Sequence, residues 1–386
     1  MNLRLFSLVL FLSVLAGLFA CQHPQSPPPV ISDQETFTKQ VQIPEAAQIV
    51  EINHRLGGVV VIGWEKPFIL LEGTKHVIAD TTSGARDASQ SIDLQVRAQA
   101  PNRLVIEHQA MGRAGRKSVE ERSVDLVLHV PRAMALDMDV RHGDVTVTNM
   151  QSPVSIDHRE GDVEVESIED KLQIRSENGD VAVRTVAGPL KLDSRIGKVR
   201  IEGIEGEVAI QHQEGNVRAT NLRGKAIFNC YKSNLYIESV EGRLEIDNRR
   251  GDVECRDFAE GLDVYILHGT LKAEPGHVMT NSYYCRVVDG DAILRIPAES
   301  SALFELEAEN GRIHSDYHVR VWAEGKVSVA KGAIHDGLNM VSCQVVKGSI
   351  SILRSLTEFS REETDKDTPA LSSKQDSGLT PARVGQ

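Results

Sequence analysis

Aromatic side chains are scarce in this sequence of 386 residues, where they make up only 4%. A deep globular core ordinarily relies on such large side chains, so their scarcity argues against one. A thin core between two sheets, filled by Val, Ile and Leu, fits the composition better. The length is sufficient for two domains or for one long repeat structure.

The sequence also has no excess of basic residues, because it contains 43 Lys and Arg but 55 Asp and Glu. The formal net charge is therefore -12. Binding to the backbone of DNA or RNA requires a basic face, so nucleic acid is not expected as a partner.

Cysteine is sparse, with five residues and no Cys-x-x-Cys pair. A zinc knuckle or a redox pair is therefore not expected. If Cys21 carries a lipid, Cys230, Cys255, Cys285 and Cys343 remain, and an exported protein could pair them. The repeat spacing given below places Cys230 and Cys255 on different sheets and turns, beyond disulfide reach. We expect buried thiols, although the sequence leaves open whether all four stay reduced.

Motifs of common enzymes are missing too, since no Gly-x-Ser-x-Gly elbow and no zinc-binding helix occurs. The segment 112–118 has the lysine of a phosphate-binding loop, but Arg116 stands where glycine should precede Lys117. It predicts a mobile basic loop. No catalytic residues and no cofactor are predicted.

The segment 1–20 indicates a targeting sequence, with Arg4 before an apolar run from Leu5 to Phe19. The run is too short, and too near the terminus, for a membrane span. The ending Leu18-Phe19-Ala20-Cys21 resembles the bacterial lipobox, which implies cleavage before Cys21 and diacylation of its thiol. The alternative is an ordinary secretion signal in which this cysteine is incidental.

Lipidation would place the protein in the bacterial cell envelope, because two acyl chains anchor a protein stably. Gln22 differs from the Asp that holds many such proteins at the inner membrane. The outer membrane, on its periplasmic or surface face, is therefore the expected location. The expected partners are the membrane, through Cys21, and an envelope protein or glycan.

Composition divides the chain into five segments. They are a signal peptide (1–20), a Pro-rich tether (21–40), a β-rich N-terminal cap (41–140), a repeat region (141–355) and a disordered tail (356–386). Within the cap, the polar stretches 79–90 and 111–121 predict loops. The cap is expected to cover the first turn of the repeat, since an open sheet end would pair with other chains.

The feature that the chain has in abundance is a regular repeat between Gly143 and Gly269, in which the same pattern returns at every eighteenth position. We number each repeat from position 0, which is held by Gly143, Gly161, Gly179, Gly197, Gly215, Ser233, Gly251 and Gly269. Positions 2, 4, 7, 11 and 13 are apolar, and position 15, which is often small and polar, also points inward by alternation. Glycine recurs at position 9, so we expect tight corners with positive φ at positions 0–1 and 9–10.

Two short strands and two corners per turn predict an all-β fold, a parallel β-solenoid with turns of 18–21 residues behind an N-terminal β cap. Right-handed winding is expected from the chirality of parallel crossovers. After Gly269 the spacing lengthens, and the next equivalent glycines are Gly290 and Gly311. The last strands are expected to close the far end.

Three parts of the chain share a similar run of residues: Val50 to Asn53 followed by Gly58 to Trp64, Val130-Pro131 before Leu136 to Val147, and Ile296-Pro297 before Phe304 to Gly311. These runs resemble the bacterial "putative adhesin" family, a domain of unknown function. The resemblance covers roughly residues 45–355. It implies an envelope-associated β-solenoid and supplies no catalytic residues.

Three carboxylates, Asp144, Asp162 and Asp180, fall on successive turns directly after the glycine of position 0. Oxygen ligands at such short intervals could hold Ca²⁺. Asp also favours the turn after Gly for conformational reasons alone, and Lys198 interrupts the column. We therefore expect turn residues, no metal site, and weak or absent Ca²⁺ binding.

One outward-facing cluster differs from the charged surface around it. It consists of Ile227, Tyr231, Arg249, Tyr265 and Leu267. Tyr, Arg and aliphatic side chains together are typical of a contact surface. The alternative is that C-terminal strands or a loop of the same chain cover it.

The composition and the repeat favour a lipid-anchored, non-enzymatic scaffold or adhesin-like binding surface. The alternative is a carbohydrate-active β-helix enzyme that acts on an envelope or extracellular polysaccharide. A groove lined by converging Asp, Lys and Arg would favour the enzyme, whereas flat exposed sheets would favour the scaffold.

Overall fold

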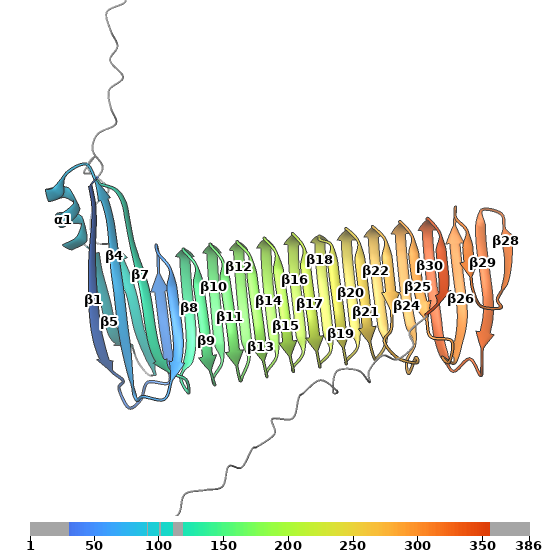
Figure 1. Cartoon of the computed structure of the whole chain (residues 1–386), viewed down its shortest axis with the longest axis horizontal. Coiled ribbons are helices and arrows are strands. Elements are labelled where there is room, and N and C mark those ends of the chain that lie inside the picture. The colour runs from blue at the N-terminus through green and yellow to red at the C-terminus, as the bar shows by residue number, and fades with distance from the viewer. Residues whose placement is uncertain (1–30, 91, 100–101, 111–118, 356–386) are drawn as a thin grey trace, which may run out of the picture. The chain divides into compact units, whose positions relative to one another are not determined.

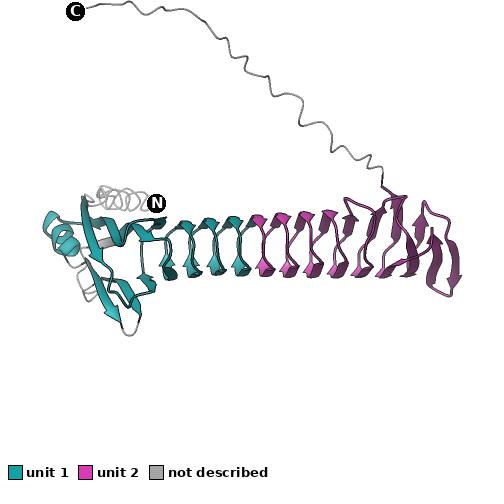
Figure 2. Cartoon of the chain, turned by 90° about the horizontal axis from the view of Figure 1, so that it is seen from below, with its two compact units in different colours: residues 1–200 teal, residues 201–386 magenta. Residues whose placement is uncertain are grey.

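The structure, a computed structural model, describes residues 31–90, 92–99, 102–110 and 119–355. The described residues form 31 strands and one helix (Figure 1), which confirms the all-β class. The chain divides into two compact units, residues 1–200 and 201–386 (Figure 2).

The first unit holds one helix and the first half of the strands. Its elements are β1 Ile31–Gln42, β2 Ile49–His54, β3 Val59–Trp64, β4 Phe68–Ala79, α1 Thr82–Gln90, β5 Ile92–Gln99, β6 Arg103–Ala110, β7 Val119–Pro131, β8 Ala135–His142, β9 Val145–Met150, β10 Val154–Glu160, β11 Val163–Ile168, β12 Leu172–Asn178, β13 Val181–Val186 and β14 Leu190–Ile196. The boundary between the units falls within β15, Val199–Ile204.

The second unit holds the remaining strands. They are β16 Val208–Glu214, β17 Val217–Leu222, β18 Ala226–Lys232, β19 Leu235–Val240, β20 Leu244–Arg250, β21 Val253–Phe258, β22 Leu262–His268, β23 Leu271–Glu274, β24 Tyr283–Asp289, β25 Ala292–Ile296, β26 Ala302–Glu309, β27 Ile313–Ser315, β28 Arg320–Glu324, β29 Val327–Ile334, β30 Asn339–Lys347 and β31 Ile350–Arg354.

Each repeat forms two short strands, and equivalent strands of successive turns pair in parallel. In the first unit Val163 of β11 lies beside Val181 of β13, and Leu172 of β12 lies beside Leu190 of β14. Side chains at positions 2, 4, 7, 11, 13 and 15 are buried between the two sheets. The predicted two-sheet parallel β-solenoid and its core positions are confirmed.

The second corner lies at positions 8–10, as at residues 169–171 between β11 and β12, close to the predicted positions 9–10, but the positive φ predicted there is wrong. Glycine at position 0 does adopt positive φ, from Gly143 at 122° to Gly269 at 147°. The other left-handed residue of the turn lies at position 6, as at Asn149 and Ser167, and not at position 9. Glycine at position 9 has a different role: a Cβ on Gly188 would meet the backbone of Asp170 at 2.5 Å.

The N-terminal end of the first unit differs from the predicted cap in its strand order. One sheet runs β1-β4-β7-β3-β9-β11-β13, and the other runs β5-β6-β2-β8-β10-β12-β14. β2 and β3 therefore stack directly on β8 and β9 as a regular turn, so solenoid stacking begins before residue 141. Antiparallel pairs cover the outermost turn, formed by β6 and β7.

Two local predictions in this region need correction. Residues 31–42, expected largely in the tether, form β1, whose alternating side chains let it pair with β4 over its whole length. The expected loop at 79–90 contains α1, which buries Ala85 and Ala88 against β1 and β4. The predicted basic loop at 112–118 lies outside the described residues.

The C-terminal end of the second unit repeats this interleaving. β30 lies between β24 and β26 in one sheet, and β31 lies between β25 and β27 in the other. The last strands of the chain are thus internal to the stack. The end itself is closed by the antiparallel strands β26, β29 and β28, contrary to the expectation that the final strands close it.

Candidate interaction surface

The predicted cluster comes together on one sheet of the second unit. Ile227 and Tyr231 lie on β18, Arg249 on β20, and Tyr265 and Leu267 on β22. These three strands are consecutive neighbours, paired in parallel and in register. All five side chains alternate with buried residues, so they project from the outer face of the same sheet.

The described strands do not cover this face. Tyr231 is 55% exposed, and the side chain of Arg249 is 57% exposed. Ile227, Tyr265 and Leu267 are half-buried by their neighbours on the sheet. Within the described residues, the alternative that the C-terminal strands cover the cluster therefore does not hold.

The surface extends onto β24, where sequence reasoning missed two residues. Tyr284, 45% exposed, lies beside Asp263, and Arg286 lies beside Tyr265. Extending the regular period from Gly269 does not reach them, because β24 follows a longer turn. Aligning Gly290 with Gly269 would have placed both on the outer face.

The charges on this face are mutually balanced. Arg249 lies 3.9 Å from Asp247, and Arg243 lies 3.7 Å from Asp263. Exposed pairs of this kind contribute little to stability, so their main consequence is to leave the surface nearly neutral. We call the set Ile227, Tyr231, Glu245, Asp247, Arg249, Asp263, Tyr265, Leu267, Tyr284 and Arg286 the tyrosine face.

The aspartates Asp144, Asp162 and Asp180 form a hydrogen-bonded ladder in the first unit. The N–H of Asp162 donates to Oδ1 of Asp144 (2.9 Å), and the N–H of Asp180 donates to Oδ1 of Asp162 (2.8 Å). The N–H of Lys198 likewise donates to Asp180 (2.8 Å). Each carboxylate thus satisfies a backbone donor of the next turn, which accounts for Asp at this position.

The same ladder lines a surface groove of about 370 Å³. Its lining includes Glu164, Lys198 and Arg200 along with the three aspartates. Acidic and basic side chains therefore converge here, which is the arrangement expected for the enzyme alternative. Among the described residues, no group of three or more His, Cys, Asp or Glu is placed to hold a metal ion.

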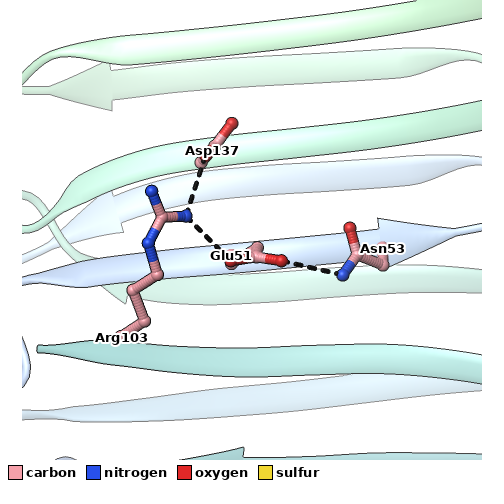
Figure 3. Close-up of polar contacts among 4 residues, drawn as sticks. All are labelled: Glu51, Asn53, Arg103 and Asp137. Atoms are coloured by element: carbon pink, nitrogen blue, oxygen red, sulfur yellow. Dashed lines mark hydrogen bonds and ion pairs between the residues drawn. The ribbon is translucent and has the colours of Figure 1, made fainter. Parts of the chain in front are cut away.

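A cluster of ion pairs and hydrogen bonds links the neighbouring strands β6, β2 and β8 (Figure 3). Nη1 of Arg103 donates to Glu51 (2.8 Å) and to Asp137 (3.0 Å), while Asn53 donates to Glu51 (3.0 Å). Burial disfavours the ionised form of Glu51, but the hydrogen bonds from Asn53 and Arg103 outweigh it and lower its pKa. The cluster joins strands that are far apart in the chain, which is a structural role.

Two histidines are buried next to each other at the same end. His54 of β2 and His108 of β6 are 1% and 3% exposed, with ring centroids 4.8 Å apart. Burial, followed by repulsion from His108, lowers the pKa of His54 to about 4. Burial also lowers the pKa of His108. Both rings are therefore neutral at pH 7.

The four described cysteines are buried free thiols, as expected. Cys230 lies on β18 and Cys255 on β21, in opposite sheets, which confirms that they are not juxtaposed for a disulfide. Burial raises the pKa of Cys230 and of Cys343 to about 12, so neither is a reactive thiolate. Cys21 lies outside the described residues, and none of the described helices is long and apolar enough to cross a membrane.

Stacked two-strand turns, a core of aliphatic columns and antiparallel closing strands define a β-solenoid repeat protein. The chain belongs to the Toastrack DUF4097 family, which matches residues 106–230 and 185–353 and so more than half of its length. No curated protein matches the sequence.

Solved structures with similar chains carry names that point to adhesion and to lipid binding. A "putative cell adhesion protein" from Clostridium sporogenes is 10% identical, with 84% of this chain and 100% of that chain covered and a TM-score of 0.20. A "putative adhesin" from Bacteroides fragilis is 9% identical, covering 83% and 97%, with a TM-score of 0.24. A "putative lipid binding protein" from Parabacteroides distasonis is 11% identical, covering 83% and 96%, with a TM-score of 0.22.

Proposed function

We propose that this protein is a lipid-anchored, non-enzymatic component of the bacterial cell envelope that binds a partner through its tyrosine face. The observation that carries the proposal is that Tyr231, Arg249 and Tyr265 share one face of three neighbouring strands, which no described strand covers. Tyr and Arg are the side chains most enriched where binding energy is concentrated. A rigid stack of paired strands holds them in place, which limits the entropy lost on binding.

The experiment that tests this function is crosslinking in intact envelopes followed by capture of the protein. Wild type is compared with a Tyr231→Ala plus Tyr265→Ala double variant, and Tyr236→Ala serves as the matched control. Tyr236 lies on β19, in the opposite sheet of the same unit. We expect one defined crosslinked species, lost only in the double variant, at an unchanged melting temperature. A pattern that is identical in all three proteins would refute the proposal.

Attachment through Cys21 belongs to the same proposal. The support is the apolar N-terminal run and the lipobox-like ending at Cys21. Two acyl chains would hold the protein at the membrane surface, and the outer membrane is the proposed location. The tyrosine face would then meet envelope components by proximity, with no transmembrane helix required.

The groove of the first unit supports a second candidate function, hydrolysis of a polysaccharide. Equivalent residues on adjacent strands lie about 5 Å apart, which is close to the separation of the two carboxyl groups in retaining glycosidases. However, each aspartate of the ladder already accepts a backbone hydrogen bond. This engagement favours the structural role of the ladder.

Asp162→Asn separates the two readings of the groove, because an amide oxygen can still accept the hydrogen bond from Asp180. If the ladder is structural, the variant keeps its stability, and neither protein releases reducing sugar from envelope polysaccharide. Polysaccharide cleavage by wild type that is lost in Asp162→Asn would establish the enzyme instead. Addition of Ca²⁺ to both proteins in a melting assay completes the test, with no shift expected.

A further inference from the structure

The tyrosine face is an open, nearly flat sheet surface on which the aromatic rings are separated. Tyr231 lies at repeat position 16 of β18, Tyr265 at position 14 of β22, and Tyr284 beside Asp263 on β24. The rings therefore lie on a diagonal that runs from β18 to β24, with no tyrosine on the intervening strand β20. They do not form one continuous apolar patch, because Asp247, Asp263 and Arg249 lie among them.

The spacing of the three tyrosines follows from the geometry of the sheet. Tyr231 and Tyr265 are two strands and two residues apart, which places their Cα atoms about 12 Å from each other. Tyr265 and Tyr284 are diagonal neighbours on adjacent strands, about 8 Å apart. Each step is on the order of one to two pyranose rings.

We propose that the tyrosine face binds an extended, uncharged glycan chain, a ligand class that rests on the proposed binding function. A pyranose ring presents an apolar C–H face, which packs on an aromatic ring, and a rim of hydroxyl groups. Those hydroxyl groups both donate and accept hydrogen bonds, as the side chains of Asp247, Asp263, Arg249 and Arg286 require. Aromatic rings set apart by polar side chains fit such a chain along its length.

The charges on the face distinguish this ligand from the other candidates. Each of the three acidic side chains of the face pairs with a basic side chain, so the face offers no strong net attraction to a polyanion or to an acidic membrane. A protein partner would be expected to meet a contiguous, desolvated apolar centre, and the ionic side chains between the tyrosines interrupt one. An uncharged hydroxyl-rich chain is the partner that balanced charges and separated rings favour.

The test is calorimetric titration of the full protein with cellohexaose, N-acetylchitohexaose, xylohexaose and maltohexaose, with the galacturonic acid hexamer as the charged probe. We expect at least one neutral hexasaccharide to bind, and the corresponding trisaccharide to bind more weakly because it covers fewer tyrosines. Tyr265→Ala should weaken binding about tenfold, which is the loss of roughly one aromatic contact. Tyr236→Ala on the opposite sheet should leave the affinity unchanged.

Three results would overturn the glycan proposal: no neutral hexasaccharide binds, the charged probe binds better, or the Tyr231, Tyr265 and Tyr284 triple alanine variant binds as wild type does. Equal melting temperatures exclude misfolding as the cause of any loss. If the crosslink to an envelope protein still depends on Tyr231 and Tyr265 while no glycan binds, the ligand class is wrong and the binding function stands. If neither assay depends on these tyrosines, both proposals fall.

Discussion

Most turns of the repeat have two residues in the left-handed conformation, and the sequence analysis identified only one of the two positions. At position 0 glycine is needed wherever φ is positive, because Gly179 has φ of 136° and a Cβ there would overlap the carbonyl of Gly161, whereas Ser233 holds this position without positive φ. At position 6 the residues are small and polar, as in Asn221 (φ 58°) and Ser239 (φ 57°). Asn and Asp tolerate this conformation, so the column was readable. Glycine at position 9 was the more conspicuous signal and marked the second corner, but it lacks the expected positive φ.

Burial of the pair His54 and His108 should make the free energy of unfolding depend on pH. The pKa of His54 is 6.5 in an ordinary environment and about 4 in the folded protein, so between these values the unfolded chain binds more protons. Stability from the neutral ring is complete above about pH 6.5 and is lost as the pH falls toward 4. We expect His54 alone to remove about 3 kcal/mol of unfolding free energy over that range, measured by urea denaturation.

The matched variant for this prediction is His54→Ile, because Val140 and Ile266 hold the equivalent position on other strands. It should reduce the loss of stability between pH 6.5 and 4, while His314→Ala, at a side chain that is 70% exposed, should not. The other charged groups that act on the two rings are Asp125, which favours the charged form of His54, and Arg55, which disfavours that of His108. An equal acid-induced loss in wild type and His54→Ile would show that other groups control it.

At the scale of strands, the sequence predicts which face of a strand is buried better than it predicts which strands pair with each other. Alternation placed Val163 and Val165 inside, and the fixed period paired each strand with its equivalent in the next turn. The period could not show that β2 inserts between β6 and β8, or β30 between β24 and β26. Every one of these strands presents the same alternating pattern, so any could stack on any other. The choice depends on long-range contacts such as the clasp of Arg103 with Glu51 and Asp137.

The insertion of β31 predicts an unusual sensitivity close to the end of the described chain. Ile352 is completely buried, since β31 lies between β25 and β27, whereas its neighbour Leu353 is only half-buried. Ile352→Ala should cost about 3 kcal/mol of unfolding free energy, and Leu353→Ala less than about 1 kcal/mol. Urea denaturation of both variants measures the difference. Similar, small effects would mean that β31 behaves as a frayed terminal strand.

The candidate site shows the same limit of sequence reasoning. Tyr231, Arg249 and Tyr265 were found because they lie within the regular period, and the structure brings them together on β18, β20 and β22. Tyr284 and Arg286 were missed because the turn before β24 is longer and shifts the count. The groove along Asp144, Asp162 and Asp180 was anticipated only as a column, since a hollow depends on how outward side chains lean.

For the whole molecule, the distribution of charge and burial fits the proposed binding through an exposed surface. The described solenoid core contains aliphatic side chains and neutral polar ones, and its thiols have raised pKa values that make them poor nucleophiles. The ionisable residues lie mainly outside, many in ion pairs between neighbouring strands. The location of the protein in the cell then determines which molecules its exposed face can contact.

Attachment to a membrane is therefore the property that connects the fold to the proposed function, and Cys21 is the residue that tests it. Wild type should sediment with outer membranes and carry labelled acyl chains, whereas Cys21→Ser should appear in the soluble fraction without label, since it lacks the thiol that begins the anchor. Cys230→Ser is the matched control, because that thiol is 4% exposed on β18 and should leave both fractionation and labelling unchanged. Recovery of Cys21→Ser in the membrane fraction, or an N-terminus of the mature wild type at another residue, would contradict lipid anchoring. In the first case the tyrosine face or another surface would have to hold the protein at the membrane, and the Tyr231→Ala plus Tyr265→Ala variant would then be the one to dissociate.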